Sequence, residues 1–154
     1  MKQIISLLTK YFADAVEFKE GLRKDSFLIL KDPSKITELL QFLKENGFNM
    51  LIDLTAVHYP HKENKFEVIY NMLSMEPYLR LIVKVPLKED WPEIDSVSSI
   101  YKTANWYERE VYDMFGIRFK NHPNLKRILM WDEFEGHPLR KEYPLEGDNL
   151  HCHD

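Results

Sequence analysis

Cysteine and glycine are scarce in this chain of 154 residues. The single cysteine, Cys152, excludes an intramolecular disulfide and cannot supply the several thiolates that an iron–sulfur cluster requires. The five glycines are too far apart to form a G-x-G-x-x-G motif or a phosphate-binding loop. A G-x-S-x-G nucleophile elbow is also missing. The sequence therefore predicts no cofactor or metal bound to this chain and no serine-hydrolase chemistry.

Long apolar runs and basic runs are missing as well. No segment approaches the ~20 apolar residues of a transmembrane helix, and the apolar stretch in the first ten residues is too short for a signal peptide. The net charge of -4 and the lack of a run of five basic residues disfavour nucleic acid as a partner. We therefore expect a cytoplasmic protein that binds no nucleic acid.

Helical periodicity is clear in two segments of the N-terminal half. An apolar stripe along residues 4–15 predicts a helix that docks on a sheet. A second helix is expected to begin at Asp32-Pro33, because Asp is a good N-cap and proline suits the first helical turn. Its stripe runs through residues 36–43, and Gly47 is expected to end it.

Alternating apolar and polar residues predict three strands, at 49–58, 66–75 and 79–85. Their short connections favour an antiparallel meander, and two shorter strands are expected at 15–19 and 25–31. A helical stretch is expected after Pro92, followed by a helix that Asn105 and Glu108 open as a capping box and Gly116 ends. The predicted fold class is α+β, with a largely antiparallel sheet packed by helices.

The periodicity is lost from Ile117 onward. A segment of this length exceeds the roughly 12 to 15 residues usual for a structureless loop, yet it is too rich in aromatic and aliphatic residues for a disordered tail. Since it cannot build its own core, we expect it to lie on another protein. The chain is therefore divided into an α+β core domain, residues 1–116, and an extended, irregular, partner-binding C-terminal arm, residues 117–154.

Charged and aromatic side chains alternate between Glu108 and Pro144, a composition typical of protein interfaces. Glu108 and Glu110 point to nearly opposite sides of a helix, which disfavours a shared catalytic proton. Arg109 and Asp113 are four residues apart and can pair. The alternative interpretation of this group is a solvated helix face.

The histidines allow competing interpretations. His58 and His61 flank a proline turn, which explains them better than a metal site. His122 and His137 each precede proline and either begin turns or form hydrogen bonds across a junction. The terminal segment 151–154, His-Cys-His-Asp, is expected to be disordered rather than to bind a metal.

Several spaced motifs together resemble a known family. They are Glu108-Arg109-Glu110, Asp113-Met114-Phe115, His122, Lys126, Ile128-Leu129, the run from Gly136 to Lys141, and Tyr143-Pro144. This pattern is similar to the signature of the small hydrophilic C subunit of bacterial complex I, the NADH:quinone oxidoreductase, whose plastid-type counterpart is the J subunit. Asn124, Trp131 and Glu142 depart from that pattern.

The resemblance implies a non-redox structural subunit in the peripheral arm of a proton-translocating complex that oxidises NADH and reduces quinone. FMN and iron–sulfur clusters are then expected in other subunits, and this chain is expected to clasp the quinone-site D subunit near the B and I subunits. The chain would reach the cytoplasmic face of the cell membrane only through the complex. It would be an enzyme subunit without catalysis of its own.

The resemblance implies a partner interface made by the charged and aromatic residues of this segment. These residues are Glu108, Arg109, Glu110, Tyr112, Asp113, Phe115, His122, Lys126, Arg127, His137, Arg140, Lys141 and Tyr143. The equivalent subunit of a membrane-bound nickel–iron hydrogenase or of an F420 dehydrogenase would show similar residues. Two further alternatives are a free-standing adaptor and a self-sufficient carboxylate- or metal-dependent hydrolase that uses Glu108, Glu110, His122 and His137.

Overall fold

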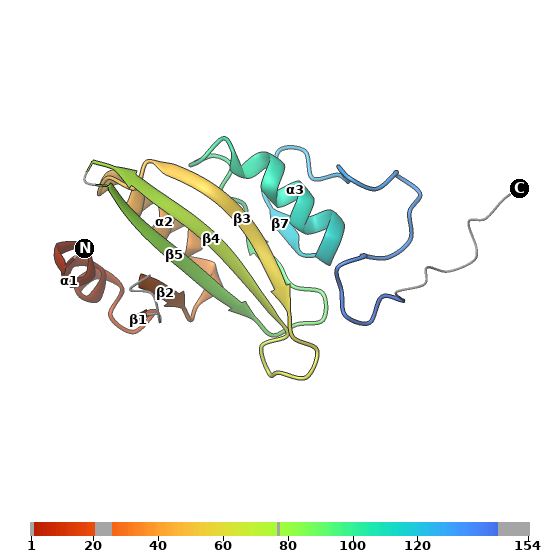
Figure 1. Ribbon diagram of the computed structural model, residues 1–154, viewed down its shortest axis with the longest axis horizontal. Helices are drawn as coiled ribbons and strands as arrows, with labels where there is room; N and C mark the ends of the chain where they lie inside the picture. Colours follow the sequence, from red (N-terminus) through yellow and green to blue (C-terminus); the bar gives the residue numbers. More distant parts are fainter. Residues whose placement is uncertain (1, 21–25, 77, 145–154) are drawn as a thin grey trace, which may run out of the picture.

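A mixed five-stranded sheet forms the centre of the protein. The computed structural model describes residues 2–20, 26–76 and 78–144 (Figure 1). The strands are β1 (Val16–Glu20), β2 (Ser26–Leu30), β3 (Met50–His58), β4 (Phe66–Met75) and β5 (Tyr78–Leu87), in the spatial order β1-β2-β5-β4-β3. The predicted meander is confirmed, because β3, β4 and β5 are antiparallel neighbours. Strand β2 pairs in parallel with β5 and in antiparallel with β1, so the α+β fold contains one parallel pairing in this sheet.

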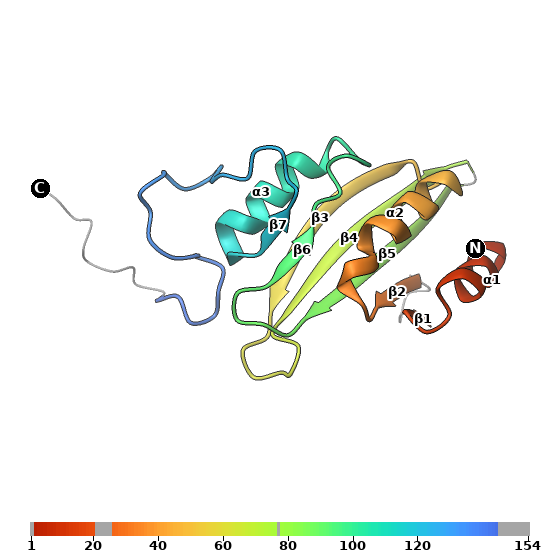
Figure 2. The ribbon, with the colours of Figure 1, turned by 180° about the vertical axis from the view of Figure 1, so that it is seen from behind.

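Helix α2 (Ile36–Glu45) covers one face of this sheet, as Figure 2 shows. Its stripe residues Ile36, Leu39, Leu40 and Leu43 are fully buried in the core. The predicted start is confirmed with one refinement, because the chain first makes a 3-10 turn, η1 (Pro33–Lys35). The Asp32 side chain accepts the Ser34 N–H there. Helix α1 (Lys2–Phe12) meets α2 at Phe42, whose ring lies 5.6 Å from the Phe12 ring.

The segment after Pro92 forms no helix, so that expectation is wrong. It contains the short strand β6 (Glu93–Asp95), which pairs in parallel with β7 (Arg118–Lys120), a strand that periodicity did not reveal. The Ser96 hydroxyl accepts the Ser98 N–H at 3.2 Å, which offers the backbone a local alternative to helical hydrogen bonds. Ile117 and Phe119, at the start of the predicted arm, belong to the hydrophobic core.

Helix α3 (Ala104–Phe115) lies against the edge strand β3. The Tyr107 hydroxyl donates to the Ile52 carbonyl at 2.8 Å, so the helix occupies part of the edge of the sheet. Gly116 ends the helix in the left-handed conformation, φ +74°, as predicted. The predicted capping box is wrong, because the Glu108 side chain bonds Ser96 and Val97 instead of the helix start. None of the described helices is both long and apolar enough to cross a membrane.

Two buried tyrosines, Tyr101 and Tyr70, differ in whether their hydroxyl groups form a hydrogen bond. The Tyr101 hydroxyl donates to the Phe48 carbonyl at 2.6 Å and joins the segment before α3 to the segment after α2. The Tyr70 hydroxyl, in the middle of β4, has no hydrogen-bond partner in the described part of the chain. The two residues are 4% and 0% exposed, so burial is nearly the same and the hydrogen bond is the main difference.

This difference predicts opposite effects of the same substitution. Tyr101→Phe should lower the free energy of unfolding by about 1 kcal/mol, because it deprives a buried carbonyl of its donor. Tyr70→Phe should be neutral or stabilising, because it removes a desolvated hydroxyl that gains little in return. Urea unfolding of both variants tests this. A Tyr70→Phe loss as large as that of Tyr101→Phe would contradict it.

Candidate functional site at the end of helix α3

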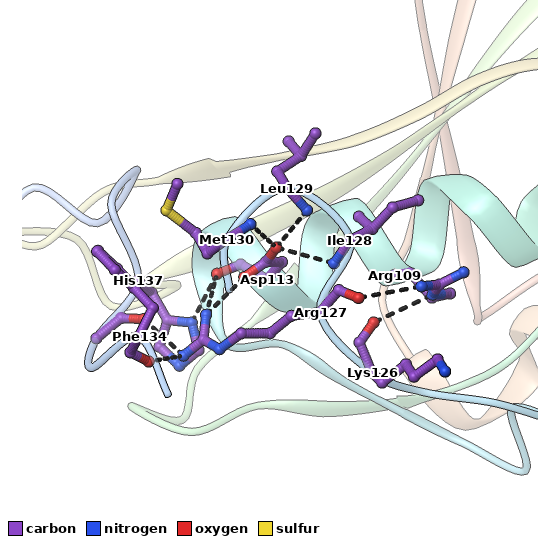
Figure 3. Close-up of polar contacts among 10 residues, drawn as sticks. Arg109, Asp113, Lys126, Arg127, Ile128, Leu129, Met130, Phe134 and His137 are labelled. Carbon is purple, nitrogen blue, oxygen red and sulfur yellow. Dashed lines mark hydrogen bonds and ion pairs between the residues drawn. The ribbon is translucent and has the colours of Figure 1, made fainter. Parts of the chain in front are cut away.

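The buried carboxylate of Asp113 joins helix α3 to the C-terminal arm (Figure 3). Its Oδ1 accepts from the Arg127 guanidinium at 2.5 Å. Its Oδ2 accepts three backbone N–H groups, those of Ile128 at 3.0 Å, Leu129 at 2.8 Å and Met130 at 2.9 Å. Burial by itself would raise the pKa of Asp113, but these four donors outweigh it and hold that pKa below its usual range.

The last four carbonyls of α3 each receive a donor, three of them from the arm. Such carbonyls have no partner within a helix and must be satisfied elsewhere. The acceptor–donor pairs are Tyr112 O with Gly116 N at 2.8 Å, Asp113 O with His137 Nδ1 at 2.9 Å, Met114 O with Leu139 N at 3.0 Å, and Phe115 O with Arg140 Nε at 2.7 Å. The arm therefore acts as the C-terminal cap of this helix.

Arg109 makes its contacts one turn earlier on α3. Its Nε donates to the Lys126 carbonyl at 3.1 Å and its Nη2 to the Arg127 carbonyl at 3.0 Å (Figure 3). The pairing of Arg109 with Asp113 that their spacing allows is not formed, because both side chains reach into the arm instead of toward each other. Arg127 in turn donates to the carbonyls of Phe134 and Gly136. These bonds close the loop formed by residues 127–136.

Arg140 and His58 attach the far end of the arm to the sheet. The Arg140 guanidinium lies 5.0 Å from the Phe66 ring and 4.2 Å from the Trp91 ring. The His58 ring stacks on Phe66 at 4.4 Å and accepts the Lys141 N–H at 3.0 Å through Nδ1. From the sequence, His58 was expected in a turn and Trp91 had no expected role, since no local pattern links either residue to the arm.

Glu108 forms a second buried polar cluster on α3. Its carboxylate is fully buried and accepts from the Ser96 hydroxyl at 2.5 Å and from the Val97 N–H at 2.7 Å. The His122 Nε2 lies 3.8 Å away. Burial raises the pKa of Glu108 to about 7, against the lowering effect of these two hydrogen bonds.

His122 is held as a neutral ring in this cluster. Its Nδ1 accepts the Asn124 N–H at 3.0 Å, so Nε2 carries the proton and donates to the Asn105 carbonyl at 3.1 Å. Burial lowers the pKa of His122, which favours the same neutral form. The bond to Asn124 is local to the segment after β7, and the bond to Asn105 joins that segment to helix α3.

The residues predicted as a partner interface differ widely in exposure. Glu108 and Asp113 have no exposed surface and cannot contact a partner in this conformation, and Arg109 and Phe115 are also buried. The half-buried members are Tyr112, His122, Arg127, His137, Arg140 and Tyr143, and the exposed ones are Glu110, Lys126 and Lys141. The interface role of the residues other than Glu108 and Asp113 stays a prediction, as does the boundary between core and arm.

The residues proposed for a hydrolase do not come together. Glu108 lies near His122, but His137 bonds the Asp113 carbonyl and Glu110 is exposed. Within residues 2–20, 26–76 and 78–144, no three His, Cys, Asp or Glu side chains are grouped so that they could hold a metal ion. The terminal histidines and Cys152 lie outside the described residues.

Fold and site together define an α+β scaffold in which ionic side chains fix an extended arm on a helix end. Residues 29–149 match the family described as the 30 Kd subunit of the respiratory-chain NADH dehydrogenase. The chain is 44% identical to the NADH-quinone oxidoreductase C subunit of Geotalea uraniireducens, across 95% of this chain and 88% of that relative. It is 43% identical to the C subunit of Geobacter metallireducens, across 95% and 90%. This chain belongs to the 30 kDa subunit family of the respiratory-chain NADH dehydrogenase, as the motifs indicated.

Two solved structures share the fold. A trypsin-resistant fragment of Nqo5 is 27% identical, with a TM-score of 0.71 over 80% of this chain and 99% of that one. A chain in the archaeal membrane-bound sulfane sulfur reductase is 29% identical, with a TM-score of 0.74 over 97% of this chain and 86% of that one. The second match includes most of the arm as well as the core.

The Asp113 contacts predict a large loss of stability on neutralisation. Asp113→Asn should lower the free energy of unfolding by about 3 kcal/mol, because it leaves Arg127 and the backbone donors without a buried anion. Glu110→Gln, on the exposed side of the same helix, serves as control and should change stability by less than about 0.5 kcal/mol. Chemical denaturation measures both, and equal effects of the two substitutions would contradict the prediction.

Glu108 predicts a pH-dependent contribution to stability. Its pKa is about 7 in the folded chain and ordinarily 4.5, so its contribution is complete below pH 4.5 and is lost as pH rises through 7. Glu108→Gln keeps the neutral form, so the variant should gain about 3 kcal/mol relative to the wild type between pH 4.5 and 8. Denaturation curves of both proteins between pH 4.5 and 8 test this prediction. A difference in their free energies of unfolding that does not change with pH would contradict it.

Proposed function

We propose that this chain is a non-redox structural subunit in the peripheral arm of a proton-translocating NADH:quinone oxidoreductase. In this proposal it clasps the quinone-site D subunit near the B and I subunits, at the cytoplasmic face of the cell membrane. NADH and quinone are the substrates of the complex, FMN and iron–sulfur clusters belong to partner subunits, and the isolated chain is not catalytic. The relatives named as C subunits of NADH-quinone oxidoreductase support membership in such a complex.

The arrangement of the arm carries this proposal. Its backbone is fastened to α3, while Leu129 and Leu139 are 59% and 51% exposed. Large apolar side chains on an ordered backbone are typical of binding surfaces, since a partner gains their burial without ordering the segment first. The polar side chains thus hold the arm in place, and the apolar ones are available to a neighbouring subunit.

This geometry refines the expected way in which the arm acts. The sequence predicted that the arm finds its contacts on another protein. Between Lys126 and Lys141, however, several of its backbone groups bind this chain's own α3 or β3, and Arg127 and Arg140 bind α3. In the proposed complex, a partner therefore meets a preformed surface, and the outward side chains contribute most of the contact.

The sulfane sulfur reductase match favours a second candidate. It extends over 97% of this chain, so the same scaffold is present in a respiratory membrane complex of another name. The equivalent subunit of a related complex with a different electron donor is therefore the alternative. Affinity purification of the tagged chain from its own host distinguishes the two, because the electron-input subunits that copurify differ.

Substitutions on the outer surface of the arm should impair assembly without unfolding the chain. Leu129→Glu combined with Leu139→Glu should reduce recovery of partner subunits at least about tenfold, since charge replaces apolar contact at a desolvated interface. Tyr78→Glu, at a 76% exposed site on β5 away from the arm, should not. Copurification and circular dichroism measure both effects. Normal assembly of the double variant would count against the proposed docking surface.

A further inference from the structure

A hollow of about 340 Å³ lies beside the C-terminal end of α3. We name it the Trp91 pocket, and it is lined by Trp91, Tyr112, Gly116, Arg118, Leu125 and His137. Its walls combine aromatic rings with a guanidinium, and none of its six lining residues is acidic. Pockets walled by Trp, Tyr and Arg are typical places where interfaces concentrate their binding energy.

The His137 ring is held in place between the aromatic walls. Its centroid lies 6.0 Å from that of Trp91 and 6.3 Å from that of Tyr112, and its Nδ1 donates to the Asp113 carbonyl. A Cβ on Gly116 would lie only 2.6 Å from this ring. Glycine at this position therefore permits both the helix ending and the close approach of His137.

Arg140 brings an unused donor to the same wall. Its side chain is 9% exposed, its Nε donates to the Phe115 carbonyl and its Nη1 lies 3.6 Å from Glu142. Its Nη2 is buried and has no hydrogen-bond partner in the described part of the chain. That atom lies 2.9 Å from the position of a Cβ on Gly116, so it lies directly behind the pocket lining. A buried guanidinium N–H that lacks an acceptor would stabilise a bound group that can accept its hydrogen bond.

A second guanidinium stands at the rim. The Arg118 side chain is 70% exposed, and its Nη1 lies 3.6 Å from a Glu93 carboxylate oxygen. At this distance and exposure the pair is weak, so Arg118 is available to a better-placed carboxylate. Two guanidiniums thus approach one aromatic-walled hollow, one from its rim and one from behind its inner wall.

We propose that the Trp91 pocket receives a carboxylate side chain, Asp or Glu, of a neighbouring protein subunit. This inference rests on the proposed function, because that function supplies the partner. Charge complementarity favours an acidic side chain over a basic one, because the Arg118 and Arg140 guanidiniums lie at the rim and behind the lining of the pocket. The Arg140 guanidinium behind the lining adds positive charge that favours a carboxylate in the pocket.

A bound carboxylate would also change the protonation of His137. Burial lowers the pKa of His137 in the free chain, and the Arg140 and Arg127 guanidiniums lower it further. Since Nδ1 already donates, Nε2 carries a lone pair that can take up a proton and then donate to the carboxylate. The other ionisable groups around this ring are Tyr112 and Arg118 in the lining and Asp113, whose carboxylate faces Arg127.

Binding of a small carboxylate to the full chain tests the pocket itself. Glutarate, titrated into isotope-labelled protein, should shift the NMR signals of the Trp91 indole and the Gly116 amide in a saturable way. It should also raise the pKa of His137. The neutral analogue glutaramide should not. Arg118→Gln should weaken glutarate binding about tenfold, while Arg80→Gln, an exposed arginine on β5, should leave it unchanged. Equal responses to both compounds, or none to either, would overturn the proposal.

Assembly of the complex tests the partner. Arg118→Glu should reduce recovery of partner subunits at least about tenfold, and Arg80→Glu should not. If the wild-type chain assembles and Arg118→Glu assembles equally well, the pocket proposal is wrong and the proposed function stands. If the wild-type chain itself recovers no partner subunits, the proposed function fails, and with it the partner assigned to this pocket.

Discussion

Asp113 places a negative charge where a helix tolerates it least. The C-terminal end of α3 already carries the negative pole of the helix dipole, and burial adds a desolvation cost. The arm offsets both effects, because Arg127 and three backbone N–H groups bind the carboxylate while His137 and Arg140 bind the last carbonyls. Without the arm, a buried anion and three helix carbonyls would lose their donors. The rest of the C-terminal structure depends on this requirement.

The same interaction explains how a segment without periodic structure can be ordered. Several of its backbone groups and the side chains of Arg127 and Arg140 bind α3, so the segment is held without a helix or sheet of its own between Lys126 and Lys141. Its apolar side chains are then not all needed for a core, and Leu129 and Leu139 are exposed. The polar contacts with α3 therefore both order the arm and leave some of its apolar side chains exposed.

Two charged residues of the family-like motif have their partners within this chain. The motif that resembles the family includes Glu108 and Asp113, and both side chains join segments of the chain itself. Paired carboxylates and histidines in such a motif suggest acid–base chemistry at first sight. Here their partners are serine, arginine and backbone groups, which is the pattern of a structural network.

Local signals in the amino-acid sequence were sufficient for the elements that form within a few residues. Alternation predicted the β3–β5 meander, an apolar stripe predicted α2, and Gly116 predicted the end of α3, because side-chain periodicity and backbone freedom act over short distances along the chain. The spaced motifs also identified the family. The hydrogen-bond partners of the Arg109, Asp113 and Arg140 side chains emerged only from the folded chain, because they lie 14 to 25 residues away and no local pattern encodes such pairings. The β6–β7 pairing and the neutral state of His122 also depend on packing between distant segments. That packing decides which side chains are buried and which hydrogen-bond donors they meet.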